Sequence, residues 1–233
     1  MQTWQRIRNA AGQLPIVSLL MVAAALAIAI IPGAADRLQL DRSAVLQQGS
    51  LWQFVTCHWT HWSVSHLFWD CLALGVLASF CEREHRARVL WCVAISVPVI
   101  PLVLWFTESW MLTYRGLSGI DSALFVLLVT MLIQNAVRCG DRLELAFAGL
   151  VFAGFTSKVA YEFLAGQTVF VDSAASGMVP VPMAHVVGAM IGLLCGVVPV
   201  AVTRLRHGIP RDVRRTDSPS FAPMGKTPTP LDC

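Results

Sequence analysis

Apolar residues fall into six long runs that are separated by short polar segments. Most of these runs come close to the roughly 20 residues that an α-helix needs to cross a bilayer. The runs cover about residues 16–33, 64–80, 89–107, 117–137, 144–166 and 181–204. Because the intervening segments are too short for a soluble domain, the pattern predicts an all-α polytopic membrane protein, a single bundle of six transmembrane helices.

The two ends of the chain are expected to lie outside this bundle. The first apolar run, Ile16 to Ile31, is longer than a typical signal-peptide core, and the "IPGAAD" at its end is a poor cleavage site. We therefore expect this run to be retained as a helix. The expected parts are an N-terminal segment (1–15), the membrane domain (16–205) and a Pro-rich, disordered tail (206–233).

Composition is typical of a membrane protein, and the Cys residues argue against disulfide and zinc sites. Hydrophobic residues make up 56% of the chain and charged residues 13%, whereas soluble domains carry about 25% charged residues. The seven Cys residues include no CxxC pair, which argues against a disulfide framework and a zinc site. We expect no metal, no cofactor and no nucleic-acid partner.

Basic residues predict how the chain crosses the membrane, because Lys and Arg are enriched in cytoplasmic loops. One set of alternate segments holds only Arg37, Arg42 and Arg115. The other set holds Arg6, Arg8, Arg83, Arg86, Arg88, Arg138, Arg142, Arg204, Arg206, Arg211, Arg214, Arg215 and Lys226. This asymmetry predicts that both the N- and C-termini are cytoplasmic.

With this threading, the second, fourth and sixth helices all start at the outer side, and each carries polar groups within two turns of its start. These groups are His66, Asp70, Ser118, Asp121 and His185. Polar and ionisable groups inside a membrane are costly and indicate a functional site. Three helices thus bring candidate functional residues to a similar depth in the membrane, near its outer side.

Small residues predict which of these helices pack closely. Every fourth residue at the start of the sixth helix is small: Ala184, Gly188, Gly192 and Gly196. Such a stripe lets two helix backbones approach each other. Gly116 and Gly119 flank Ser118, so we expect the fourth helix to dock here, although ordinary helix packing would also explain the stripe.

This arrangement predicts nucleophilic chemistry at Ser118. A Ser hydroxyl needs a base such as His185 to take its proton, and attack on a carbonyl needs donors for the oxyanion. Backbone N–H groups at a helix start are such donors, and His66 could supply another. Peptide-bond hydrolysis is therefore predicted, with helix capping and packing by Ser118 as the alternative.

Three motifs resemble the rhomboid intramembrane serine proteases: "HWSVSHLFWD" entering the second helix, "GLSG" opening the fourth and "AHVVGAMIG" in the sixth. The resemblance implies a six-helix bundle with a water-filled cavity above a short central Ser helix. It also implies a dyad of Ser118 as nucleophile and His185 as general base. The oxyanion hole would comprise His66 and the N–H groups of Leu117 and Ser118, with His61 in the hydrophilic entrance region.

Departures from the usual family pattern resemble the rhombosortase branch. Asp70 stands where Asn is usual, Ser122 stands where an aromatic residue usually stacks on the catalytic His, and the fifth helix contains Lys158 and Glu162. The branch is a bacterial inner-membrane group thought to process proteins with a C-terminal GlyGly-CTERM sorting tail. The resemblance implies membrane-anchored substrates of this kind and an active site that faces the periplasm.

Several roles stay open at this stage. Asp70 could orient His66 as a carboxylate or, when protonated, donate toward the oxyanion. Asp121 or Ser122 could replace the missing aromatic residue as support for His185. Lys158 and Glu162 could neutralise each other or contribute to substrate recognition.

Other functions also remain open. The alternatives are a general rhomboid protease of single-span proteins and a non-catalytic relative that binds client helices. A haem or metal protein would use His58, His61, His66 and His185. His61 and His66 are about 140° apart around a helix, however, so they do not share a face. A transporter is disfavoured because no inverted repeat is visible.

Overall fold

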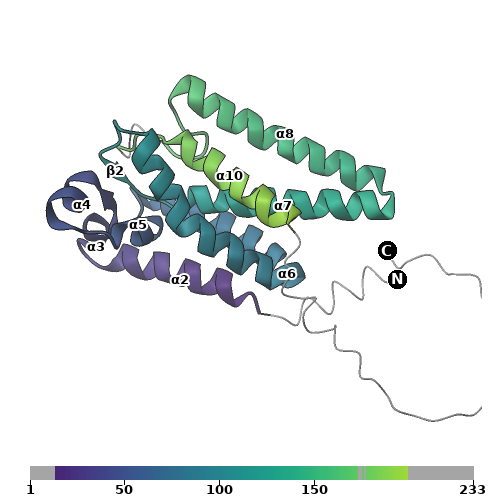
Figure 1. The fold of residues 1–233 in the computed structure, drawn as a ribbon, viewed down its shortest axis with the longest axis horizontal. Coiled ribbons are helices and arrows are strands. Elements are labelled where there is room, and N and C mark those ends of the chain that lie inside the picture. Colours follow the sequence, from purple (N-terminus) through teal and green to yellow (C-terminus); the bar gives the residue numbers. More distant parts are fainter. Residues whose placement is uncertain (1–13, 173–174, 176, 199–233) are drawn as a thin grey trace, which may run out of the picture.

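The structure is a computed structural model that describes residues 14–172, 175 and 177–198. Its long helices form a bundle (Figure 1) and are α2 (Ile16–Ile30), α6 (Val64–Thr107), α7 (Ser118–Cys139), α8 (Arg142–Ala165) and α10 (Pro182–Val197). Within the described residues, α6, α7 and α8 are long and apolar enough to cross a membrane, and α2 and α10 are shorter apolar helices.

A group of short elements between α2 and α6 lies at one end of the bundle (Figure 1). We call it the end cluster; its members are α3 (Ala34–Leu38), β1 (Leu40–Asp41), α4 (Arg42–Gln48), α5 (Gln53–Thr56) and the 3₁₀-helix η1 (Cys57–Trp59). Strand β1 pairs antiparallel with β2 (Thr113–Tyr114), which residues 115–117 connect to α7. The apolar pattern did not predict these elements, because they are too short to develop a hydrophobic period.

Helix α6 reverses direction near its middle. His85 has non-helical backbone angles (φ −149°, ψ 72°). The two ends of α6 also lie close to each other. The ring of His58, shortly before α6, lies 2.9 Å from the Val97 carbonyl oxygen in the second half of the helix. Arg42 of the end cluster donates to the Trp105 carbonyl oxygen, near the end of α6, at 2.8 Å. A straight helix of 44 residues would hold its ends about 66 Å apart, so α6 consists of two helical segments.

The sequence predicted a polar loop between residues 80 and 89. The structure instead has helix on both sides of a break at the single residue His85. Glu, Arg and Ala in "CEREHRAR" are good helix formers, so the helix continues through this charged stretch on both sides of His85. Glu82 accepts a hydrogen bond from Arg86 Nε at 2.9 Å, one helical turn later. The other four apolar runs correspond to α2, α7, α8 and α10, with ends shifted by a few residues in the described part of the chain.

Buried Glu82 also fixes the start of α2. Pro15, at the N-cap position of α2, makes no side-chain cap bond. The Glu82 carboxylate instead accepts hydrogen bonds from the Val17 and Ser18 N–H groups and from the Ser18 hydroxyl, all at 3.1–3.2 Å. First-turn N–H groups have no partner within their own helix, so a side chain of α6 caps α2 in this protein.

Helix α7 lies at the centre of the bundle, and α10 packs closely along it (Figure 1). Helix α7 is far more buried than α8: 61% of its 18-residue apolar stretch is buried inside the protein, against 11% for the corresponding stretch of α8. Two Gly residues of α10 allow the approach: a Cβ atom added at Gly188 would lie 2.0 Å from the Gly119 carbonyl oxygen, and one added at Gly192 would lie 2.0 Å from the Ala123 carbonyl oxygen. Backbone therefore packs directly against backbone.

The N-terminal segment up to residue 13 and the tail from residue 199 lie outside the described residues, so the part boundaries expected from the sequence stay predictions.

We predict that Gly188→Ala destabilises the protein, because the new methyl group would overlap backbone that cannot move like a side chain. Overpacking of this kind costs about 1–3 kcal/mol. Thermal unfolding in detergent micelles measures the effect. Gly149→Ala in α8 is the matched control, since a Cβ there meets nothing within 4 Å. Equal unfolding temperatures for the two variants would contradict the packing described here.

Candidate active site

The site begins at the junction between β2 and α7. Gly116 has φ +120°, a conformation that L side chains rarely adopt. A Cβ at this position would also lie 2.9 Å from the His66 ring and 3.2 Å from Asp70 Oδ2. Only Gly fits, and its small size brings the start of α7 against the outer turns of α6.

Asp70 accepts hydrogen bonds from the backbone at the start of α7. Its Oδ2 accepts from the Leu117 N–H at 2.9 Å, and the same oxygen lies 3.2 Å from His66 Nε2 and 3.3 Å from His61 Nε2. Asp70 is buried. Leu117, the N-cap residue of α7, makes no side-chain cap bond, so Asp70 performs this role from α6. One backbone N–H and two imidazole nitrogens thus converge on one carboxylate oxygen.

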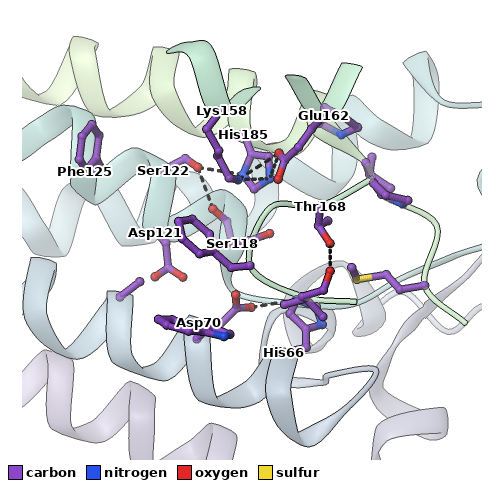
Figure 2. A pocket seen from close by; sticks show the side chains of 18 of the residues that line it. His66, Asp70, Ser118, Asp121, Ser122, Phe125, Lys158, Glu162, Thr168 and His185 are labelled. Atoms are coloured by element: carbon purple, nitrogen blue, oxygen red, sulfur yellow. Dashed lines mark hydrogen bonds and ion pairs between the residues drawn. The ribbon is translucent and has the colours of Figure 1, made fainter. Parts of the chain in front are cut away.

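His185 is held through both ring nitrogens. Its Nδ1 lies 3.0 Å from Ser122 Oγ, and its Nε2 lies 3.1 Å from Lys158 Nζ and 3.2 Å from Glu162 Oε2. Lys158 Nζ also donates to Glu162 Oε2 at 3.0 Å. Figure 2 shows this chain of contacts from α7 through α10 to α8. The imidazole therefore has a polar partner on each side.

Ser118 is the first residue of α7 and lies one turn before Ser122, on the same face. Ser122 Oγ lies 2.9 Å from the Ser118 carbonyl oxygen, which places Ser122 between Ser118 and His185 (Figure 2). Among the described residues, no hydrogen bond joins the Ser118 hydroxyl to His185. The arrangement brings the two residues together but leaves Ser122 as the direct partner of the imidazole.

These side chains line one cavity of about 660 Å³. Its polar members are grouped around Ser118 and His185, and its apolar wall comes from α6 and α8, with Trp69 and Val76 on one side and Val151 and Phe155 on the other. A cavity with a few convergent polar groups and apolar walls is typical of a binding site. The size and lining suit an apolar chain segment laid between α6 and α8.

Two further buried side chains stand near this site. The Tyr114 hydroxyl and Asp121 Oδ1 have no hydrogen-bond partner among the described residues, and both residues line the cavity. Burial raises the pKa of Tyr114 well above its usual value of 10, so this hydroxyl stays neutral. Buried polar atoms without a partner are rare in native proteins and indicate positions for water or for a polar group of a substrate.

His58 lies away from the cavity, within the end cluster. Burial lowers its pKa to about 4, and its ring contacts the Val97 carbonyl, so it is a neutral structural donor. In the described part of the chain, no group of three or more His, Cys, Asp or Glu residues is arranged to hold a metal ion.

Each residue singled out from the sequence thus has a defined place. His66, Asp70, Ser118 and His185 line the cavity, and the Leu117 N–H is engaged by Asp70. Sequence reasoning missed that the Lys158–Glu162 pair contacts His185. One signal was present: the pair lies near the end of the fifth apolar run and His185 lies near the start of the sixth, so adjacent antiparallel helices bring them to the same level.

Comparison with known families now bears on this geometry. A model of the Rhomboid domain family matches residues 48–201, which is well over half of the chain. The chain belongs to the rhomboid family. Rhomboids are intramembrane serine proteases that act on membrane proteins, and the apolar helices agree with a multi-pass membrane protein. No curated protein matches the sequence.

We predict that Asp70→Leu destabilises this rhomboid, because the buried Leu117 N–H would lose its acceptor. An unpaired buried donor costs about 1–3 kcal/mol. Asp70→Asn should retain most of the stability, since its amide oxygen can still accept. Asp36→Leu is the control, because this carboxylate is 75% exposed in its ion pair with Arg115 and such pairs contribute about 0–1 kcal/mol. Thermal unfolding in detergent would refute the prediction if Asp70→Leu unfolded at the native temperature.

Proposed function

We propose that this rhomboid is a serine endopeptidase in which Ser118 is the nucleophile and His185 the general base. The observation that carries the proposal is the convergence of both residues on one cavity, linked by Ser122 at 2.9 Å and 3.0 Å. The family relationship supports the same reaction.

In the proposed reaction, the proton of the Ser118 hydroxyl passes to His185 as the oxygen attacks the substrate carbonyl carbon. The carbonyl electron pair moves onto its oxygen, and the peptide C–N bond then breaks as His185 gives the proton to the leaving nitrogen. Water hydrolyses the acyl-enzyme by the same steps. His185 must first exchange its Ser122 contact for Ser118, which lies one turn earlier on the same face of α7.

The oxyanion would form close to the position that Asp70 Oδ2 occupies. Three nitrogen atoms surround this oxygen: the Leu117 N–H donates to it, and His66 Nε2 and His61 Nε2 lie 3.2 Å and 3.3 Å from it. Donors of this kind stabilise the negative charge of a tetrahedral intermediate. For a substrate oxygen to use them, the Asp70 side chain has to turn away, or it has to be protonated and donate to the oxyanion itself.

We further propose six membrane crossings with both ends of the chain in the cytoplasm. The reversal of α6 at His85 provides two segments, which with α2, α7, α8 and α10 make six. The starts of α7 and α10 would then face the outer side, together with the end cluster. In a bacterium this is the periplasmic side of the inner membrane.

For the substrate, we propose membrane-anchored proteins with a C-terminal GlyGly-CTERM tail. The support comes from the resemblance to rhombosortases at Asp70, Lys158 and Glu162. The apolar wall between α6 and α8 supports a transmembrane segment as the bound group. A general rhomboid protease with a wider range of single-span substrates is the closest alternative.

One observation favours a second candidate function, the binding of client helices without cleavage. Both ring nitrogens of His185 are engaged by residues other than Ser118. If this arrangement persisted when a substrate was bound, Ser118 would have no base. The cavity would then hold a transmembrane segment without cutting it.

We predict that Ser118→Ala and His185→Ala each abolish cleavage of a single-span reporter that carries Gly-Gly at the outer end of its helix. Residues of one catalytic unit are not additive, so the double variant should be no slower than either single variant. Cleavage is measured by immunoblot in cells that express both proteins, and equal membrane insertion of each variant is the control.

Three results of this experiment separate the candidate functions. Cleavage that survives Ser118→Ala would disprove the dyad. A matched reporter with Val-Val in place of Gly-Gly should stay intact; its cleavage would indicate a general rhomboid protease. Capture of the intact Gly-Gly reporter by the native protein, without cleavage, would indicate client binding.

We predict that a reporter fused after Cys233 reads as cytoplasmic and that one fused after Gly166, at the end of α8, reads as external. The reason is the crowding of Arg and Lys on one side of the bundle. A phosphatase that is active only outside the cytoplasm measures this directly. The opposite pair of readings would invert the proposed orientation and move the site to the cytoplasmic side.

A further inference from the structure

The contacts of His185 with α8 were not expected from a dyad. Glu162 is almost completely buried, and its Oε2 lies 3.2 Å from His185 Nε2. Lys158 Nζ lies 3.1 Å from the same nitrogen and donates to the same carboxylate oxygen at 3.0 Å. Burying a charged group is costly, so a buried carboxylate in contact with both an ammonium group and an imidazole calls for an explanation.

Counting hydrogens shows that the ring can be held in two neutral forms. If Lys158 donates to Nε2, the ring proton is on Nδ1 and is donated to Ser122, whose own proton goes to the Ser118 carbonyl. If Nε2 carries the proton, it is donated to Glu162, and Nδ1 accepts from Ser122. The Ser118 carbonyl then keeps its ordinary helical hydrogen bond. Only the second form leaves the basic nitrogen facing α7.

We propose that Glu162 is a positioning residue for His185, which extends the dyad to an acidic third member. Glu162 accepts the Nε2–H, selects the tautomer in which Nδ1 is free to act as base toward α7, and stabilises the imidazolium that forms when the Ser118 proton arrives. This inference rests on the function proposed above. It assigns to Glu162 a role beyond neutralising Lys158 or recognising substrate.

Lys158 has the opposite influence on the same ring. Its positive charge disfavours the imidazolium and its N–H favours the other tautomer, while its ion pair holds the Glu162 carboxylate in place. A carboxylate and an ammonium group beside one imidazole should move its protonation in opposite directions.

The other titratable groups near His185 act from a greater distance. The cavity that His185 lines also includes Asp121 from α7, His66 and Asp70 from α6, and Tyr114 and Arg115 from the segment before α7. Asp70 is already paired with the two His residues of the entrance. Within the described residues, the polar side chains that contact the His185 ring directly are Ser122, Lys158 and Glu162.

The test uses a fluorophosphonate, which modifies an activated Ser without requiring a particular protein substrate. The Ser118 oxygen bonds to phosphorus, fluoride leaves, and the Ser118 proton passes to His185. The rate of labelling of the full-length protein in detergent is measured against pH. Neutral His185 is the active form, so the rate falls on the acid side of the profile.

We expect Glu162→Gln to lower the plateau rate by at least about 10-fold, a part of the 10²–10⁴-fold that a general base contributes. Its acid limb should move to lower pH, because the imidazolium loses its carboxylate. Lys158→Met should move the acid limb to higher pH. Glu144→Gln is the matched control on α8: Glu144 bonds to Asn135, well before the Lys158–Glu162 pair, and it should leave both rate and profile unchanged.

A native plateau and a native acid limb in Glu162→Gln would overturn the inference. If that variant does not fold because Lys158 is left unpaired, the double variant Lys158→Met/Glu162→Gln takes its place and is compared with Lys158→Met. Equal rates and profiles in that pair would overturn the inference as well. Failure of the proposed function gives a different result, because the native protein itself would then show no labelling that depends on Ser118.

Discussion

The close contact between the backbones of α7 and α10 is the constraint on which the site depends. At Gly188 and Gly192 a side chain has no room, since a single added carbon would overlap a carbonyl oxygen of α7. This contact fixes the distance between the helices that carry Ser118 and His185. Lipid offers little hydrophobic drive for helix association, so close packing of small residues is the main source of such precision.

Buried carboxylates provide the second set of links, and each joins two elements. Glu82 of α6 caps α2, Asp70 of α6 caps α7, and Glu162 of α8 contacts His185 of α10. A charge buried in an apolar bundle is stable only when donors surround it. Because each carboxylate also has a partner on another element, the carboxylates specify which helices are neighbours and fix their relative positions along the bundle.

Local sequence was a good guide wherever a structural feature depends on a few adjacent residues. The small residues Gly188 and Gly192 predicted that the sixth helix docks closely on the fourth, and in the structure both lie against the backbone of α7. Local reasoning failed at "CEREHRAR", where charge suggested a loop but helix propensity prevailed. It also failed for the end cluster, whose short elements are held by long-range contacts such as those of Arg42 with the Met111 and Trp105 carbonyls.

The sequence by itself determined the apolar runs, the charge asymmetry and the identity of the candidate nucleophile and base, because hydrophobic period, loop charge and motif are all written in neighbouring residues. Only the tertiary structure decided what surrounds His185. The sequence left Asp121 and Ser122 as alternative supports for His185 and assigned Glu162 no contact with the imidazole. In the structure, Ser122 and Glu162 both contact the ring. Their contacts follow from the way in which α7, α8 and α10 pack, which depends on the whole bundle.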